Sequence, residues 1–278
     1  MQDDALLEIA VELLPSVAVE DCEVVRRGQF HEVVLAPGVG AVRVARDDDR
    51  VIDLERVARL TERLAELDLP FQVPVPLGPV RVHDGHAVLA TRWVAGTPAP
   101  RGSHRVAGIR RLLVGLSEVD ADDLDGLLAP PRAYAGGDRW EEVMLEEVVP
   151  RLPRRVRDDA RRRVHAVLVL DHPTRFVHGD LAGDNVLWDG DRVVGVLDWD
   201  LASAWDPAVD VACLAWHGWD TVRTVIDDDP TYERARTWYR VFGLEQIAAA
   251  LLAGLPQDEV DAIVHDITAW LERTATSD

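Results

Sequence analysis

The period of the hydrophobic pattern changes part-way along this chain, and that change constrains the fold more than any other feature of the sequence. Alternating apolar residues predict strands, whereas apolar residues three and four apart predict helices. Up to residue 93 short alternating runs predominate, and helical spacing is confined to residues 3–14 and 51–67. The runs that we interpret as strands cover residues 23–27, 31–36, 40–45, 80–83 and 87–93. This part of the chain therefore predicts a five-stranded antiparallel sheet with one inserted helix, and the Asp84-Gly85 pair favours a tight hairpin.

Beyond the segment VAGTPAP at 94–100, which we interpret as a hinge, helical spacing takes over. Helices are expected over residues 104–119, 138–149, 154–170, 208–217, 231–252 and 257–274. Only residues 176–199 return to strand-like alternation. The chain as a whole therefore predicts an α+β fold of two lobes. The small N-terminal lobe, with the sheet and one helix, covers residues 1–93, and the larger, mostly helical lobe covers residues 101–278.

Composition is typical of a soluble globular protein. At 278 residues, 47% of them hydrophobic, the chain is long enough to bury a large core. Its longest apolar runs fall short of the roughly 18–20 residues that span a membrane, and the acidic start MQDDALLEIAVELL is unlike a signal peptide. The two cysteines, Cys22 and Cys213, lie far apart in the sequence, which favours reduced thiols over a disulfide. We therefore expect a cytoplasmic protein with no membrane partner.

The charge balance is strongly acidic, with 50 acidic and 30 basic residues and a formal net charge of −20. Such a field repels nucleic acid and attracts cationic small molecules, although acidity can also serve solubility alone. All 30 basic residues are arginine, because the sequence contains no lysine. That absence excludes a Walker A phosphate-binding loop, which requires a lysine. The expected partners are small molecules and not nucleic acid.

One short segment concentrates polar groups that can take part in chemistry. The stretch HGDLAGDNVLW, residues 178–188, places Asp180 and Asn185 five residues apart, and the later strand VVGVL ends at Asp198. If the strand after Asn185 pairs with VVGVL across the turn DGDR, Asn185 and Asp198 lie at neighbouring strand ends. Their oxygens are the type of ligand that Mg²⁺ prefers, and Asp180 on the preceding loop is expected to face the same space.

This arrangement suits phosphoryl transfer, in which a metal offsets the charge of the triphosphate and the acceptor hydroxyl is held in line. A carboxylate with an ordinary pKa of roughly 4 is a weak base towards an alcohol. We therefore expect Asp180 to orient the hydroxyl and to take its proton late. The alternative is a turn whose side chains cap backbone amides. We expect His178 to be structural, and Asp184 and Asp200 can be ordinary solvated charges.

The motifs HGDLAGDNVL and GVLDWD closely resemble those of the aminoglycoside phosphotransferases, an antibiotic kinase family of the protein-kinase-like superfamily. They match the kinase pattern H-x-D-L-x-x-x-N, and the resemblance continues through WDPAVDVACLA at 205–215. It extends over nearly the whole chain, although only residues 178–210 match with high specificity. The resemblance implies a bilobal kinase fold, a cofactor of Mg²⁺, and ATP or GTP as the phosphate donor.

The resemblance also implies roles for individual residues. Asp180 takes the position of the catalytic base, and Asn185 and Asp198 take those of the Mg²⁺ ligands. Asp206 and Asp210 match positions that brace the catalytic segment in such enzymes.

The missing lysine is a departure from the family pattern. Kinases of this superfamily place a lysine on the third strand, where it holds the α- and β-phosphates and pairs with a helix glutamate. Here Arg43 in AVRVAR is the candidate replacement, because arginine is always charged and binds phosphate oxygens through a bidentate fork. Arg46, three residues on, is expected to point to the opposite face of the strand and is the weaker candidate. Glu55 is the expected helix partner, with Glu62 second, and either is alternatively an exposed charge.

The remaining nucleotide contacts are predicted from two segments. RRGQFHEVV, which corresponds to the phosphate-covering turn, has the single glycine Gly28 in place of a GxGxxG pattern, so its backbone amides are weak candidates. The stretch TRWVAG is expected to offer the nucleotide base a backbone donor and acceptor near Arg92, Trp93 and Val94. Trp93 either shapes the base pocket or fills the core.

The acceptor site is predicted from weaker signals. GQFHEVV together with HGDLAGDNVLW resembles the viomycin and capreomycin phosphotransferases, and AVRVAR is similar to the macrolide kinases. Residues 216–242 are expected to face the acceptor. The candidate substrate-binding residues are Asp200, Trp216, Asp227 and Asp228, the last two within an acidic cluster that can receive ammonium groups. The alternatives are a helix N-cap for the cluster and core packing for Trp216, Trp219 and Trp238.

The sequence therefore predicts an enzyme that moves the γ-phosphate of ATP or GTP to a hydroxyl of a small cationic antibiotic such as an aminoglycoside. Alternative acceptors are a tuberactinomycin peptide, a macrolide or a small metabolite. A nucleotide-binding pseudokinase is the alternative of another class, favoured by the missing lysine and opposed by the intact Asp180, Asn185 and Asp198. The absence of a GxSxG argues against an α/β-hydrolase, and His83 and His86 lack the further ligands of a metal site.

Overall fold

The computed structural model describes residues 1–26, 31–46 and 51–275, and it divides the chain into two compact units. Unit 1 comprises Met1–Pro100, Ala107–Leu128 and Gly183–Asp200. Unit 2 comprises Arg101–Val106, Ala129–Ala182 and Leu201–Asp278. Besides the N-terminal sheet, unit 1 contains the hairpin around residues 186–196 and the helix after the predicted hinge, and the predicted lobe boundaries at 93 and 101 stay a prediction.

The N-terminal sheet of unit 1 has the predicted five antiparallel strands. They are β1 (Glu23–Val25), β2 (His31–Ala36), β3 (Gly40–Ala45), β4 (Arg81–His83) and β5 (His86–Arg92), in the spatial order β1-β2-β3-β5-β4. The hairpin between β4 and β5 turns at Asp84 and Gly85, whose φ angles are +48° and +86°. Two successive positive φ angles are the signature of a type I′ turn, so the predicted tight hairpin is confirmed.

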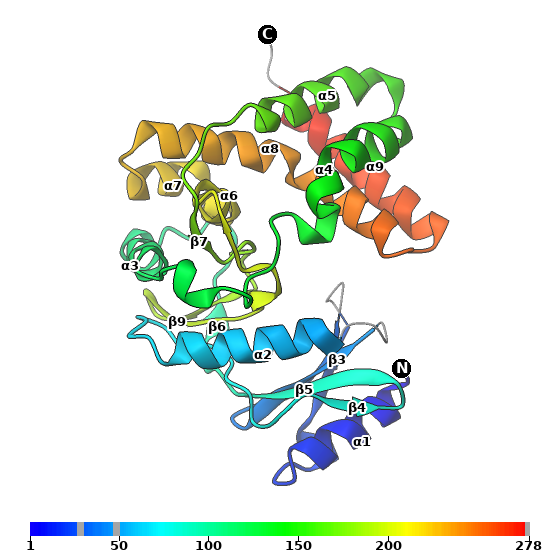
Figure 1. The fold of residues 1–278 in the computed structure, drawn as a ribbon, viewed down its shortest axis with the longest axis vertical. Coiled ribbons are helices and arrows are strands. Elements are labelled where there is room, and N and C mark those ends of the chain that lie inside the picture. The colour runs from blue at the N-terminus through cyan, green and yellow to red at the C-terminus, as the bar shows by residue number, and fades with distance from the viewer. Residues whose placement is uncertain (27–30, 47–50, 276–278) are drawn as a thin grey trace. The chain divides into compact units, whose positions relative to one another are not determined.

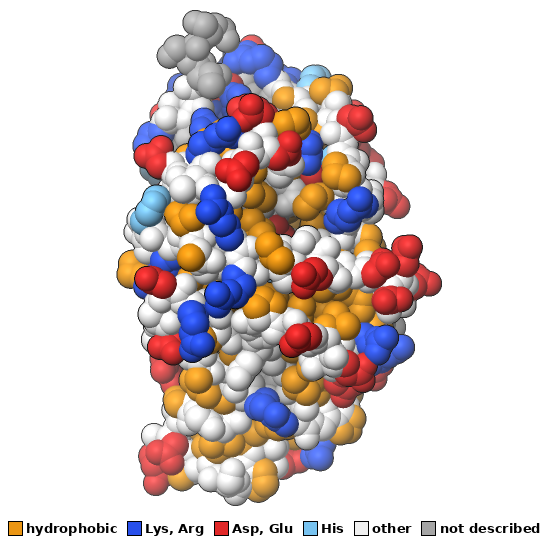
Figure 2. Space-filling view, turned by 90° about the vertical axis from the view of Figure 1, so that its left-hand side faces the viewer, with side chains coloured by type: hydrophobic (Ala, Val, Ile, Leu, Met, Phe, Trp, Pro, Cys, Tyr) orange, Lys and Arg blue, Asp and Glu red, His pale blue; other side chains and the backbone are white. Residues whose placement is uncertain are grey.

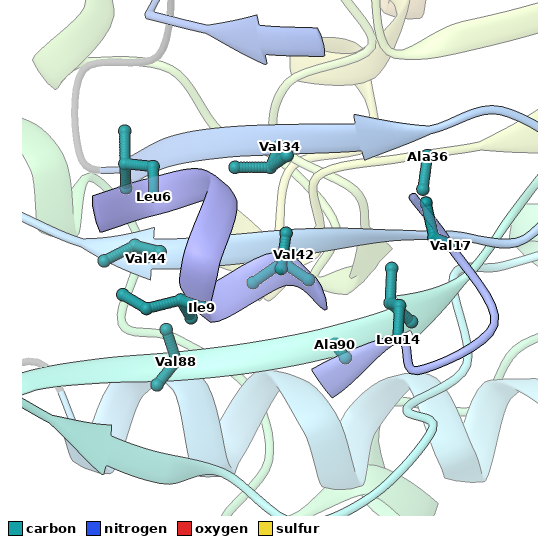
Figure 3. Close-up of a cluster of buried hydrophobic side chains, with 11 residues drawn as sticks. Leu6, Ile9, Leu14, Val17, Val34, Ala36, Val42, Val44, Val88 and Ala90 are labelled. Atoms are coloured by element: carbon teal, nitrogen blue, oxygen red, sulfur yellow. The ribbon is translucent and has the colours of Figure 1, made fainter. Parts of the chain in front are cut away.

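Two helices cover opposite faces of this sheet (Figure 1). On one face α1 (Asp3–Leu13) packs its buried side chains against alternate residues of β2, β3 and β5, as Figure 3 shows for Leu6 and Ile9. On the other face α2 (Val51–Ala65) packs Leu54 and Ala58 against small and aliphatic residues of β3 and β5. Because successive strand residues point to opposite faces, Arg43 lies on the α2 face, between Val42 and Val44 of the α1 face.

The rest of unit 1 holds the hairpin that carries the predicted metal ligands Asn185 and Asp198, which together are called the metal-ligand motif. Strand β8 (Val186–Asp189) pairs with β9 (Arg192–Val196) and with the short strand β6 (Thr97–Pro98), which was not predicted. Gln72 exchanges backbone hydrogen bonds of 2.9 Å with Val194 and Val196 on the outer side of β9. Helix α3 (Val106–Ser117) packs so closely that a Cβ on Gly108 would lie 2.4 Å from the ring of Trp188. These contacts explain why the hairpin belongs to unit 1.

Unit 2 is mainly helical, as predicted. Its long helices are α5 (Arg154–Leu168), α8 (Asp229–Leu252) and α9 (Gln257–Arg273), and the shorter ones are α4 (Trp140–Glu142), α6 (Ala208–Cys213) and α7 (Trp219–Val225). The buried Arg163 of α5 donates to the carbonyl oxygens of Arg240 in α8 and Leu271 in α9, which ties the three long helices together.

Two features of unit 2 differ from the prediction. The helix expected over 138–149 is α-helical only at α4, continues as a π-helix over Val143–Val148 and ends in a 3₁₀ turn containing Pro150. Proline lacks the amide that a helix needs to continue. A two-stranded sheet joins β7 (Arg175–Val177) to β10 (Ser203–Trp205), and three residues are too few to give β10 a readable alternation.

Within the described ranges, no helix combines the length and the apolarity that a membrane span requires. Both cysteines are free thiols. Acidic side chains and arginines are interspersed over the face drawn in Figure 2, so the net charge of −20 does not form one acidic patch there.

Candidate active site

The two predicted metal ligands lie at neighbouring strand ends in unit 1. Asn185 immediately precedes β8, and Asp198 follows β9, where the amide of Leu197 donates to the carbonyl oxygen of Asn185 at 2.8 Å. The Asp198 side chain is 49% exposed, and its backbone is left-handed, with φ at +61°. This confirms the predicted hairpin and its strand-end pairing.

One carboxylate and one amide oxygen are hard donors that fit Mg²⁺. Among the residues that the structure describes, there is no group of three or more His, Cys, Asp or Glu side chains placed to hold a metal.

Arg43 reaches this motif from the middle of β3. Its Nη2 contacts the carboxylate of Asp200 and lies 3.4 Å from Oδ1 of Asp198 and 2.9 Å from Nδ1 of His31. Arginine has only donors, so Nδ1 of His31 is the acceptor in this contact. Burial disfavours the charged form of Asp200, but Arg43, a hydrogen bond with Asp198 and the nearby His31 together outweigh it and hold the pKa of Asp200 well below its ordinary value. The structure thus places a permanent cation beside the metal-ligand motif.

The predicted pairing of Arg43 with Glu55 is not formed in the described structure. Helix α2 turns Leu54 and Ala58 towards the sheet, and Glu55 is exposed. Glu62 is exposed as well. The residue that does reach the motif from α2 is Arg56. Its Nη2 donates to the carbonyl oxygen of Asp200 at 2.7 Å and its Nη1 to that of Leu127 at 3.0 Å.

Arg46 lies on the opposite face of the sheet from Arg43, as expected. It donates to the carbonyl oxygen of Arg26 at 3.3 Å and, with Val44, lines a cavity of about 340 Å³ on the α1 side. Glu32 lines the same cavity with a negative charge and pairs with Arg26 and with the N-terminal amine. Arg46 is therefore separated from the metal-ligand motif by the sheet.

In the segment predicted to contact the nucleotide base, two of the three candidate backbone amides already have acceptors within the protein. The amide of Arg92 donates to the carbonyl oxygen of Val75 at 2.7 Å, and that of Trp93 donates to the carbonyl oxygen of Val39 at 3.2 Å. Val94 is buried and packs on β9, where a Cβ on Gly195 would lie 2.2 Å from its Cγ1. Val94 thus stays the candidate donor of this segment. Gly28 of the phosphate-covering turn lies outside the described residues.

The predicted catalytic loop lies in unit 2, where its backbone is fixed by a buried carboxylate. The amides of His178 and Gly179 each donate to Asp210 at 2.8 Å, and the amide of Asp180 donates to Nδ1 of His178 at 3.2 Å. Gly179 has φ at +85°, and a Cβ there would lie 2.6 Å from the carbonyl oxygen of Leu201, so this position requires glycine. His178 is fully buried, which fits its predicted structural role.

Asp210 therefore braces the backbone of residues 178 and 179, in the segment predicted to be catalytic. Burial raises the pKa of Asp210 to about 7, with two backbone amides opposing the rise and the charge of Asp180 adding to it. Asp206 braces a different element. It accepts hydrogen bonds from Nε1 of Trp238 at 2.7 Å and from Nε of Arg234 at 3.1 Å, both on α8.

A second buried carboxylate of unit 2 was not predicted. Glu245 of α8 is 1% exposed and accepts hydrogen bonds from the hydroxyl of Tyr134 at 2.5 Å and from Nε1 of Trp140 at 2.8 Å. Burial raises its pKa, and Tyr134, Arg132 and Trp140 oppose the rise. The available signal was an acidic residue within the otherwise apolar helical stretch FGLEQIAAALL.

The predicted acceptor residues are distributed over several environments. Asp200 faces Arg43 with a side chain only 13% exposed, and its assignment to the acceptor site stays a prediction. Asp228 is the N-cap of α8 and accepts from the amide of Thr231 at 2.8 Å. Asp227 is exposed, and the ring of Trp216 lies 5.6 Å from the guanidinium carbon of Arg101. Trp238 is fully buried, so it belongs to the core and not to a pocket wall.

Comparison with known proteins places the chain in a family. Residues 33–250 match the phosphotransferase enzyme family, abbreviated APH. The chain is 32% identical over 266 residues to the viomycin phosphotransferase of Streptomyces vinaceus, an alignment that covers 86% of this chain and 90% of that protein. The chain belongs to the phosphotransferase enzyme family.

Solved structures show the same fold at low sequence identity. The GDP and kanamycin complex of APH(2")-IIIa superposes with a TM-score of 0.80 at 16% identity, covering 98% of this chain and 99% of that one. The streptomycin-ATP complex of APH(2")-IIa gives a TM-score of 0.70 at 16% identity, with 99% and 97% covered. The macrolide 2'-phosphotransferase MphH of Brachybacterium faecium gives 0.68 at 19% identity, with 99% of each chain covered. The predicted antiparallel-sheet lobe and helical lobe are thereby confirmed.

Proposed function

We propose that this phosphotransferase is a small-molecule kinase that moves the γ-phosphate of ATP or GTP to a hydroxyl of a small cationic antibiotic such as an aminoglycoside. The observation that carries the proposal is the cluster in unit 1. Asn185 and Asp198 supply two oxygen ligands at adjoining strand ends, and the guanidinium of Arg43 lies beside the same carboxylate at 3.4 Å. Phosphoryl transfer needs both a metal site and a fixed cation for the phosphates.

In this mechanism Asn185 and Asp198 would hold Mg²⁺, which offsets the charge of the triphosphate when bound. Arg43 would bind phosphate oxygens, because its fork geometry suits them and it is charged at every relevant pH. The hinge would hold the nucleotide base through backbone groups at Arg92, Trp93 and Val94, with Val94 as the donor.

Asp180 is proposed to orient the acceptor hydroxyl towards the γ-phosphate and to take its proton late. Asp210 would serve this step indirectly, since it fixes the two amides that precede Asp180. General base assistance of this kind contributes about 10²–10⁴ in rate.

The acceptor is proposed to be a cationic antibiotic because a chain with net charge −20 attracts cations and its relatives carry such molecules in their names. A tuberactinomycin peptide is supported by the relative at 32% identity, a viomycin phosphotransferase. A macrolide and a small metabolite are the other acceptors to test. Asp200, Trp216, Asp227 and Asp228 remain predictions for this site. We also propose that the enzyme acts in the cytoplasm, which its two free thiols favour.

The proposal is tested by release of nucleoside diphosphate from Mg-ATP and Mg-GTP against a panel of acceptors, with Asp180→Asn as the control. The panel holds aminoglycosides, tuberactinomycin peptides, macrolides, choline and homoserine. Acceptor-dependent release that the variant lacks supports the kinase and names its acceptor class. Nucleotide binding without transfer to any acceptor would favour the pseudokinase, against which the intact Asp180, Asn185 and Asp198 already argue.

A further inference from the structure

Asp198 has an unusual backbone for a residue with a side chain. Its φ of +61° lies in the left-handed region, which costs more free energy for a residue with a side chain than for glycine, although aspartate tolerates it better than most residues. Asp198 is also the carboxylate proposed to hold the metal. The groups that impose this conformation therefore decide where the metal ligand is placed.

The two residues after Asp198 are fixed at three groups. Trp199 is fully buried, donates from Nε1 to the carbonyl oxygen of Val196 at 3.0 Å and stacks on Phe71 with ring centroids 6.3 Å apart. The carboxylate of Asp200 pairs with Arg43. The backbone carbonyl oxygen of Asp200 accepts a hydrogen bond of 2.7 Å from Arg56. The chain leaving Asp198 is thus held at a side-chain ring, at a carboxylate and at a backbone carbonyl.

Arg56 is the contact that comes from the helix. The same guanidinium donates to the carbonyl oxygen of Leu127 at 3.0 Å, so it joins α2, the segment after α3 and the segment after β9. Its guanidinium has no acceptor capacity and satisfies two backbone carbonyls at once. Glu55, the neighbour on α2 that the family pattern favours for this role, is exposed.

We propose that Arg56 and Asp200 are positioning residues for the metal ligand Asp198, an inference that rests on the proposed kinase function. Asp200 links the phosphate-binding Arg43 of β3 to Arg56 of α2. This Arg43–Asp200–Arg56 triad performs the coupling that a lysine on the third strand and a helix glutamate perform in other kinases. The charges are reversed relative to that pair, because here helix α2 supplies the cation Arg56 and Asp200, after β9, supplies the acceptor groups.

The inference predicts an effect on metal-dependent binding rather than on folding alone. Binding of ADP or GDP is measured by calorimetry with and without Mg²⁺, so that no turnover is needed. In Arg56→Ala the gain in affinity that Mg²⁺ gives is expected to fall by about 10-fold, the lower end of the range for groups that orient metal ligands. Affinity without Mg²⁺ is expected to stay within about twofold. Arg59→Ala, which removes an exposed arginine from the same helix, is the matched control and is expected to keep the full gain.

An unchanged Mg²⁺ gain in Arg56→Ala overturns the inference. If Arg56→Ala does not fold, as judged by circular dichroism, Arg56→Lys is measured in its place. A lysine has one charged head and cannot span both carbonyls, so the gain should still fall, and an unchanged gain in that variant overturns the inference equally.

A double-mutant cycle tests whether Arg56 acts through Asp198. In Asp198→Ala the Mg²⁺ gain is already lost, so adding Arg56→Ala should cause no further change. Additive losses mean that Arg56 acts elsewhere and overturn the inference. A wild-type protein that binds nucleotide with no Mg²⁺ gain and transfers no phosphate overturns the proposed function and this inference together. A normal wild-type gain with an unaffected Arg56→Ala overturns this inference alone.

Discussion

Two regions of the molecule hold the candidate catalytic groups by opposite electrostatic means. In unit 1 the carboxylate of Asp200 faces the guanidinium of Arg43, and its pKa is held low although burial opposes that charge. In unit 2 the carboxylate of Asp210 accepts from two neutral backbone amides, and burial raises its pKa to about 7. The first region is fixed by an ion pair and the second by dipoles.

The difference follows from what each region has to do. Unit 1 is proposed to receive phosphates and a metal, so a cation next to carboxylates keeps the charges balanced before the nucleotide arrives. Unit 2 has to hold a backbone loop in one conformation, and a buried acceptor for two amides does so without adding a second cation. Substitutions in the two regions should therefore fail in different ways.

The largest effect is expected for Asp180→Asn on the loop of unit 2. The amide cannot take a proton, so kcat should fall by about 10²–10⁴. Nucleotide affinity should change little, because the proposed phosphate and metal contacts belong to unit 1. Parallel measurement of turnover and of ADP or GDP binding checks both halves. Activity near that of the wild type would remove Asp180 from the proposed role.

The next largest effect is expected on the pH dependence of stability, and it concerns Asp210, the carboxylate that two backbone amides hold. Asp210 keeps its proton in the folded protein up to a pKa of about 7, whereas the unfolded chain loses it near its ordinary value. Between about pH 4 and pH 7 the unfolded chain binds fewer protons, so the free energy of unfolding falls as the pH rises. At about 1.4 kcal/mol for each pH unit, the loss reaches at most about 4 kcal/mol.

The measurement is urea unfolding from pH 4 to 7 for the wild type and for Asp210→Asn. Glu245, whose pKa burial also raises, contributes a slope of the same sign in both proteins, so the difference between them isolates Asp210. The variant should show the shallower slope. Equal slopes would mean that Asp210 is charged in the folded protein throughout this range.

Sequence reasoning was most successful where local patterns decide the structure. The five strands of the sheet follow from alternation with a period of two, and the Asp84-Gly85 turn follows from the positive φ that those residues tolerate. The pairing of the Asn185 and Asp198 strand ends follows from the length of a hairpin. In each case the information lies within a few neighbouring residues.

It was less successful where the partner is a backbone group or a distant residue. Arg56 binds two carbonyl oxygens, which leave no mark in the sequence because every residue has one. Glu55 and Arg56 are adjacent on α2, and their rotation about the helix axis differs by only about 100°. The hydrophobic pattern of α2 does not decide which of these two polar neighbours faces the motif.

A smaller effect than those on Asp180 and Asp210 is expected at the ion pair of unit 1. Arg43→Ala removes charge-assisted hydrogen bonds worth about 1.5–3 kcal/mol, so kcat/KM for the nucleotide should fall by about 10- to 100-fold. Arg46→Ala is the matched control, since it removes the same charge from the other face of the sheet. Its kinetics should stay near those of the wild type. The reverse result would assign the phosphate-binding role to Arg46.

The smallest effect is expected for Glu55→Gln. This variant tests whether Arg56, and not Glu55, links α2 to Arg43. If a glutamate of α2 positioned the phosphate-binding cation, loss of its charge would reduce kcat/KM substantially. Here that side chain is exposed, and Arg43 pairs with Asp200, so Glu55→Gln should stay within about twofold of the wild type. Asp200→Asn, measured beside it, should lower kcat/KM by about 10-fold because Arg43 loses its close partner. A large loss in Glu55→Gln with a normal Asp200→Asn would restore the glutamate pairing and remove Asp200 from the coupling.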